Sequence, residues 1–174
     1  MTDIRIMIVA MLPRLRGFAL ALARSGDAAD DLVQATCEKA LRASDSWTPG
    51  SRLDSWMFRI MQNHWIDTRR LQRPHLSIDD GDDPIEIEGE NGTRVTEARL
   101  TLDSVRELVE QLPDDQRAVL ILACVEELSY RECADVLDIP IGTVMSRLSR
   151  ARRTLFAALD GEGAGRAGAS GDGS

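Results

Sequence analysis

The chain has little of what several protein classes require. Aromatic side chains make up only 4% of its 174 residues, whereas a fold rich in β-strands would hold more aromatic and β-branched residues. No apolar run approaches the ~18 residues that a membrane-spanning helix needs, so we expect no membrane insertion. The N-terminus has an early acid, Asp3, and no small-residue cleavage site after an apolar core. We therefore expect no secretory signal.

Cysteine and histidine are also scarce. The three cysteines, Cys37, Cys124 and Cys133, are too few and too scattered for a disulfide framework. All three lie in apolar helical patterns, so we expect reduced thiols that act as small core residues in a cytoplasmic protein. No Cys-x-x-Cys, His-Glu-x-x-His or Walker motif occurs, and His64 and His75 have no ligand partners at metal-binding spacing. We expect no metal, no cofactor and no catalytic role.

The formal net charge of −8 is distributed unevenly. Residues 1–75 sum to +3, whereas residues 76–111 sum to −8. Two short stretches are basic, since residues 59–73 hold four arginines against one acid and residues 141–156 hold four arginines and no acid. A protein that is acidic overall can still bind nucleic acid when its contact faces are basic. These two stretches are therefore candidate nucleic-acid-binding surfaces.

Apolar residues recur at helical spacing in the first part of the chain, residues 1–75. The pattern predicts a first helix from about Ile4 and a second helix capped by Asp27. A third helix is expected from Ser51 to about Arg73, before Pro74. These three helices would form one small helical module.

The remaining chain divides into three parts. Residues 76–95 are acidic and lack a sustained period, which predicts a flexible linker. Residues 96–160 become helical again, with a helix start at Leu112-Pro113, and form a second module. Residues 161–174 are rich in Gly, Ala and Ser, which predicts a disordered tail. The predicted fold is all-α, with two small helical modules joined by an acidic linker.

The second module contains the pattern of a helix-turn-helix. Ser129 and Glu132 have the spacing of a capping box, which starts a helix at about Tyr130. Pro140 ends that helix, and Gly142-Thr143 starts the next one. On this second helix an apolar stripe falls on one face, and it would be buried. The stripe comprises Val144, Leu148, Ala151 and Leu155.

The face opposite that stripe carries small residues and arginines without an acid. Arginine can read guanine through two hydrogen bonds, and serine can bond to a base edge or a phosphate. A solvated, arginine-rich helix would fit the same pattern, although such helices usually mix in acids. The second helix of a helix-turn-helix can lie in the DNA major groove. The motif occurs in repressors and in activators, so at this point both functions remain open.

The first module indicates which class of helix-turn-helix protein this is. The stretches 30–41 and 53–70, followed by the linker and the helix-turn-helix, resemble the extracytoplasmic-function sigma factors of the sigma-70 family of bacterial RNA polymerase. The resemblance covers about residues 10–158, and the run Leu-Pro-Asp-Asp-Gln-Arg at 112–117 is similar to the general-stress subgroup. It implies that residues 1–75 are the sigma-2 region and residues 96–160 the sigma-4 region. The implied partners are core RNA polymerase (its β′ clamp helices and β flap), promoter DNA and an anti-sigma factor.

The resemblance also implies roles for individual residues. Docking on core polymerase would fall to an acidic and polar stripe, namely Asp30, Asp31, Gln34 and Glu38. The melted minus-10 element would be held by Arg59, Asn63, Asp67, Arg69, Arg70 and Arg73, with a flipped base in the loop 45–52. The duplex minus-35 element would be read by Thr143, Met145, Ser146, Arg147, Ser149, Arg150 and Arg153.

Several details depart from the family pattern or stay open. Asp67 either contacts a base or braces Arg70, and Trp65 either packs in the core or stacks on a base. Met145 stands where family members often carry a polar or basic residue, which leaves the minus-35 preference open. Two other functions compete with the sigma factor: a sigma-like decoy that binds only an anti-sigma protein, and a stand-alone helix-turn-helix regulator. The arginine face argues against the first, and the acidic stripe argues against the second.

Overall fold

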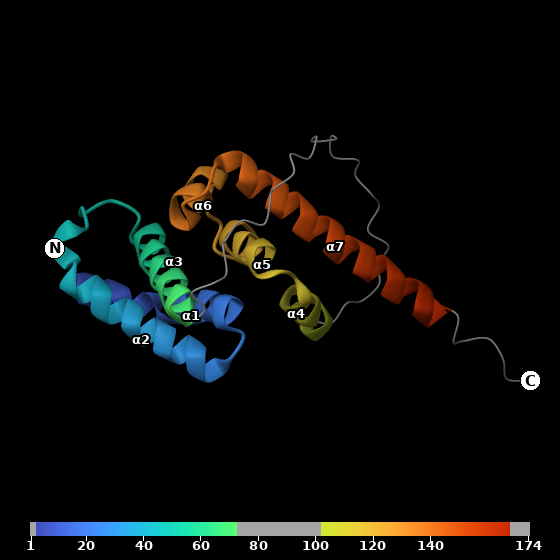
Figure 1. The fold of residues 1–174 in the computed structure, drawn as a ribbon, viewed down its shortest axis with the longest axis horizontal. Coiled ribbons are helices and arrows are strands. Elements are labelled where there is room, and N and C mark those ends of the chain that lie inside the picture. The colour runs from blue at the N-terminus through green and yellow to red at the C-terminus, as the bar shows by residue number, and fades with distance from the viewer. Residues whose placement is uncertain (1–2, 73–101, 168–174) are drawn as a thin grey trace, which may run out of the picture.

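The computed structural model describes residues 3–72 and 102–167, and every regular element in these two ranges is a helix. This confirms the predicted all-α class. The predicted linker, residues 76–95, lies outside the described residues. The elements are α1 (Ile4–Ala23), α2 (Gly26–Arg42), the short 3-10 helix η1 (Ser44–Ser46), α3 (Leu53–Gln72), α4 (Leu102–Gln111), α5 (Asp114–Leu120), the π-helical turn η2 (Ile121–Val125), α6 (Tyr130–Leu137) and α7 (Ile141–Ala167). Figure 1 shows α1 to α3 grouped at one end of the molecule and α4 to α7 at the other.

Helices α1, α2 and α3 pack on one another through apolar faces. Phe18 of α1 meets Phe58 of α3 edge to face, with ring centroids 5.3 Å apart, and both side chains are fully buried. By length and composition α1 could span a membrane, but its inner face, which includes Leu15 and Leu22, packs in this core. Such buried aromatic and aliphatic surface supplies most of the stability of a small helical module.

Two helix starts of the first module differ from the prediction by two residues each. Ser25, not Asp27, caps α2, because its backbone is extended and its hydroxyl accepts the Ala28 N–H. Ser51 does not begin α3, since its hydroxyl donates to the Thr48 carbonyl within the preceding turn. The helix starts two residues later, at Leu53.

The helix-turn-helix forms as predicted in most details. The capping box is present in full, with the Ser129 hydroxyl accepting the Glu132 N–H and the Glu132 carboxylate accepting the Ser129 N–H. Helix α6 ends at Leu137, three residues before Pro140, because Asp138 adopts the left-handed conformation with a φ of 54°. The apolar stripe of α7 is buried at Val144, Leu148 and Ala151 and half-buried at Leu155.

Two expectations for the second module are wrong. Helix α7 continues to Ala167, so residues 161–167 are helical and not a disordered tail; residues 168–174 lie outside the described ranges. Cys133 is buried and Cys37 half-buried, as expected of core thiols, but Cys124 is exposed. The π-helical turn that contains Cys124 shifts the register of this segment, which the spacing of apolar residues does not reveal.

The two modules are not separate bodies on a tether. Their buried apolar side chains form one continuous core cluster, with Leu22 and Phe58 from the first module and Leu112 and Val119 from the second. Helix α3 contacts α6, and α1 contacts α5 and η2. We call this junction, where α1 and α3 of the first module meet α5, η2 and α6 of the second, the seam. The sequence predicted the helices on both sides but gave no indication that they share a core.

Candidate nucleic-acid interface

Helix α2 presents an exposed acidic and polar ridge. The four residues expected to dock on a protein partner, Asp30, Asp31, Gln34 and Glu38, are all exposed. The Gln34 side-chain amide donates to the Glu38 carboxylate at 3.2 Å, and Asp30 pairs with Arg16 of α1 at 2.8 Å. Figure 1 shows α2 on the side of the first module away from α7.

Helix α3 carries a second exposed stripe. Arg59, Asn63, Asp67 and Arg70 are exposed, and their spacing places them on one face of the helix. This stripe has cations at both ends, with the Asn63 amide and the Asp67 carboxylate between them. The cations suit the backbone of a nucleic-acid strand, and the amide suits its bases. Arg73, the last of the predicted set, lies outside the described residues.

Arg69 does not join this stripe. It turns toward the seam, where its Nη1 donates to Asp114 Oδ2 at 3.0 Å. Its guanidinium carbon also lies 5.8 Å from the ring centroid of Trp65, within the range of a cation–π contact. Trp65 is half-buried and packs against the core, so its ring gives the Arg69 guanidinium a fixed surface to lie against. The structure thus separates Arg69 from the other described members of the predicted minus-10 set.

Helix α7 presents the third surface. Ser149 and Arg153 are exposed on the face opposite the buried stripe, and Arg150 is half-buried beside them. Arg147 lies on the flank, where its Nε is 3.3 Å from Asp115 Oδ2 of α5 and its side chain is only 19% exposed. Thr143, Met145 and Ser146 are half-buried near the start of the helix, and the Ser146 hydroxyl donates to the Thr143 carbonyl at 3.1 Å.

A cluster of charges that the sequence analysis missed occupies the seam around Asp114. Arg24 donates to Asp114 Oδ1 from Nε at 3.0 Å and from Nη2 at 2.7 Å, and Arg117 donates to the same oxygen at 2.8 Å. Arg69 donates a hydrogen bond to the other carboxylate oxygen, Oδ2. Burial by itself would raise the pKa of Asp114, but the hydrogen bonds from Arg24 and Arg117 outweigh it and lower the pKa. The carboxylate is therefore held ionised between the two modules.

Arg117 is the buried member of this cluster, with only 2% of its side chain exposed. Its Nε donates to the Ala21 carbonyl near the end of α1, and its Nη1 donates to the Leu112 carbonyl at 2.8 Å. The last carbonyls of a helix have no partner within the helix, so Arg117 satisfies one of them and places a cation at the negative end of α1. No spacing rule in the sequence distinguishes this arginine from an exposed one.

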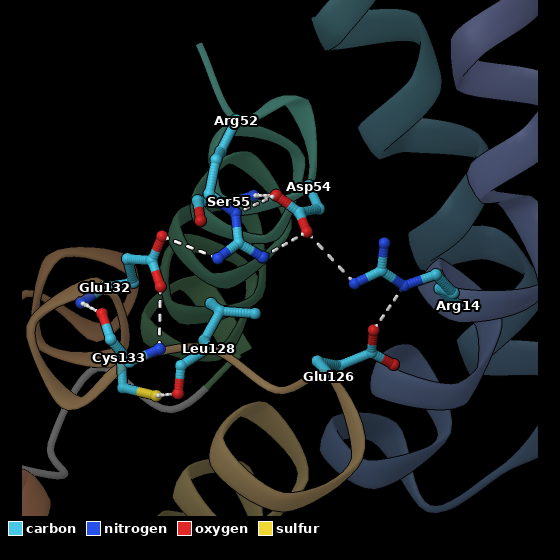
Figure 2. Close-up of polar contacts among 9 residues, drawn as sticks. Arg14, Arg52, Asp54, Ser55, Glu126, Leu128, Glu132 and Cys133 are labelled. Carbon is cyan, nitrogen blue, oxygen red and sulfur yellow. Dashed lines mark hydrogen bonds and ion pairs between the residues drawn. The ribbon is translucent and has the colours of Figure 1, made fainter.

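A second cluster crosses the seam at the start of α3. Figure 2 shows Arg14 between Asp54 and Glu126, and Arg52 between Asp54 and Glu132. The Arg14 contacts are 3.2 and 2.6 Å long, and the Arg52 contacts are 2.7 and 2.8 Å long. Burial raises the pKa of Asp54, but hydrogen bonds from Arg52, the Ser55 N–H and Arg14 lower it to about 2. Arg52 thus links the loop before α3 to the capping box of α6.

The described side chains offer binding surfaces and no metal centre. Within residues 3–72 and 102–167, no group of three or more His, Cys, Asp or Glu side chains is placed to hold a metal ion. The three exposed surfaces differ in charge: α2 is acidic and polar, whereas α3 and α7 carry arginines. This arrangement fits a protein that binds a protein partner through one surface and nucleic acid through the other two.

Comparisons with known proteins agree with this arrangement. The family model for Sigma-70 region 2 matches residues 7–74, and the model for Sigma-70, region 4 matches residues 102–155. The ECF RNA polymerase sigma factor EcfG of Rhodopseudomonas palustris (strain TIE-1) is 38% identical over 157 residues, which is 90% of this chain and 85% of that one. The ECF RNA polymerase sigma-E factor of Escherichia coli (strain K12) is 33% identical and covers 75% of this chain and 73% of its own.

A solved structure resembles the whole arrangement. It contains the sigma factor RpoE in complex with the anti-sigma factor NepR from Bartonella quintana. The likeness has a TM-score of 0.71 and 33% sequence identity, and it covers 92% of this chain and 98% of that chain. Because the match extends over nearly the full length, it includes both helical modules.

Proposed function

Because the chain belongs to the sigma-70 family, as an extracytoplasmic-function (ECF) sigma factor, we propose that it brings core RNA polymerase to a specific set of promoters and starts transcription there. The observation that carries this proposal is the separation of the three exposed surfaces on one chain. An acidic ridge on α2 is open for a protein, and arginine-bearing faces on α3 and α7 are open for nucleic acid. A stand-alone DNA-binding regulator has no need of the ridge, and a decoy has no need of the arginines.

Each surface has a proposed partner. Asp30, Asp31, Gln34 and Glu38 of α2 would dock on the β′ clamp helices, while the second module would meet the β flap. The exposed residues of α3 would hold the opened minus-10 strand through its phosphates and bases. The outer face of α7 would lie in the major groove of the minus-35 element, with Arg150 and Arg153 directed at the DNA. These roles require binding and no catalytic group, and they place the chain in the cytoplasm with the polymerase.

We also propose that an anti-sigma factor controls the chain. The relative from Bartonella quintana is in complex with such a factor, and its likeness to this chain covers both modules. In the structure the two modules are in contact, and we call this arrangement closed. An anti-sigma factor that binds the closed arrangement would keep the promoter-binding surfaces from acting together. It would work by shifting the population toward a state that the chain already adopts.

Run-off transcription with purified core polymerase tests the main proposal. The wild-type chain should yield promoter-dependent products from genomic fragments, whereas core polymerase alone should not. Asp31→Ala should weaken capture of core polymerase, while Glu107→Ala, which removes an exposed acid from α4, should leave capture unchanged. If the wild-type chain binds DNA but captures no core polymerase, it is a stand-alone regulator and the proposal is wrong.

A further inference from the structure

The first module contains a cleft whose charged walls are two arginines. Arg24 follows the last residue of α1 and has a left-handed backbone with a φ of 60°, and Arg69 lies in the last turn of α3. The cleft has a volume of about 290 Å³, and Trp65 and Gln72 also line it. Because the Arg69 guanidinium contacts the Trp65 ring, the motion of the Arg69 side chain is restricted.

A carboxylate of the second module reaches this cleft. Asp114 lies at its edge, with Oδ1 bonded to Arg24 and Oδ2 bonded to Arg69. Each oxygen thus meets a guanidinium from a different helix of the first module, at 2.7 and 3.0 Å. Two guanidiniums that converge on a pair of anionic oxygens form the arrangement with which proteins bind phosphates.

The two arginines depend on the seam for their anionic partner, whereas Asp114 does not. In the described chain, every hydrogen bond of the Arg24 guanidinium goes to the second module, to Asp114 and to the carbonyls of Glu110 and Leu112. The hydrogen bond of Arg69 also goes to Asp114. If the modules separate, Asp114 retains Arg117 of its own helix, while Arg24 and Arg69 lose their anion. The first module would then present two adjacent cations.

We propose that this cleft is a binding site for a backbone phosphate of promoter DNA, and that Asp114 occupies it while the two modules are closed. The inference rests on the proposed function as a sigma factor. It adds Arg24 to the DNA-binding residues, places Trp65 as the positioning residue of Arg69, and makes Asp114 an internal competitor of DNA. Arg69 of the cleft is the sequence neighbour of Arg70, which ends the exposed stripe of α3.

Direct binding of DNA by the intact chain tests the inference. The probe is a fluorescein-labelled single strand of mixed sequence, because phosphate contacts are independent of sequence. In an anisotropy titration Asp114→Asn should bind this strand roughly fivefold more tightly than wild type, as expected for the loss of the two partly exposed ion pairs that cross the seam to Arg24 and Arg69. Glu107→Gln, the same charge change at an exposed site of α4, should have a much smaller effect. Adding Arg24→Gln to Asp114→Asn should abolish the gain.

The salt dependence supplies a second readout. Loss of one phosphate contact should reduce the slope of log affinity against log salt by about 0.7 for a single strand. The double variant should therefore have a shallower slope than Asp114→Asn alone. The inference is overturned if Asp114→Asn binds no better than Glu107→Gln, or if Arg24→Gln changes neither the affinity nor the slope in the Asp114→Asn background.

A holoenzyme measurement covers the case in which Asp114→Asn fails to fold, which a circular dichroism melt would reveal. Arg24→Gln alone, bound to core polymerase, should then bind a fork of promoter DNA with a slope reduced by about 0.7. An unchanged slope would overturn the inference. A failure of the site differs from a failure of the proposed function, because wild type would still transcribe in the first case and would not in the second.

Discussion

The buried Arg117 offers the sharpest test of how the two modules are held together. Replacing it with methionine keeps an unbranched side chain and much of the volume but removes three hydrogen bonds, to Ala21, Leu112 and Asp114. The carbonyls of Ala21 and Leu112 would each lose a buried hydrogen bond. A buried polar group without a partner costs about 1–3 kcal/mol, so we expect Arg117→Met to lower the free energy of unfolding by about 3 kcal/mol.

Urea denaturation followed by circular dichroism measures this change. Because both modules share one core, wild type should unfold in a single transition, and the variant should shift its midpoint without a loss of helix in water. The control is Arg106→Met, since Arg106 is 71% exposed and its ion pair among the described residues is with Glu110, four residues away. That change should cost less than about 0.5 kcal/mol. A loss below about 1 kcal/mol for Arg117→Met would refute the claim that Arg117 fastens α5 to α1.

Three further predictions concern α7, α6 and the seam. Arg150→Ala should weaken promoter binding by ~1–3 kcal/mol in a band-shift assay if Arg150 contacts a base, and an unchanged affinity would remove it from the interface. Ser129→Ala should lower thermal stability by about 1 kcal/mol through loss of the α6 cap, and an unchanged melting temperature would contradict this role. Asp54 has its pKa lowered from 3.8 to about 2, so the stability that its ionised form contributes is full above pH 3.8 and is lost as the pH falls through 2. The difference in urea midpoint between wild type and Asp54→Asn should shrink over that range, and a constant difference would refute the assignment.

Local features of the fold could be predicted from the sequence because they depend on neighbouring residues. The capping box of Ser129 and Glu132 and the buried stripe that begins at Val144 follow from spacing alone, and both are present. Helix ends were less certain, because Ser25 and Asp27 are both good caps and only the backbone of the connection decides between them. The extension of α7 beyond Gly161 was missed because glycine content predicts a broken helix.

The seam could not be predicted because its contacts join residues far apart in the sequence. Arg24 and Asp114 are ninety positions apart, and no spacing rule pairs residues at that separation. The sequence placed Arg69 in the minus-10 set with Arg70, although the two adjacent side chains point to different surfaces. A charge run thus shows that the helix is basic but does not show how its arginines divide between the exposed stripe and the seam.

Sequencing the 5′ ends of transcripts made by the purified chain and core polymerase tests the central claim most directly. The account predicts start sites that core polymerase alone does not use, each preceded by one recurrent element for α3 and another, farther upstream, for α7. The same start sites with and without the chain would contradict the claim that this protein selects promoters.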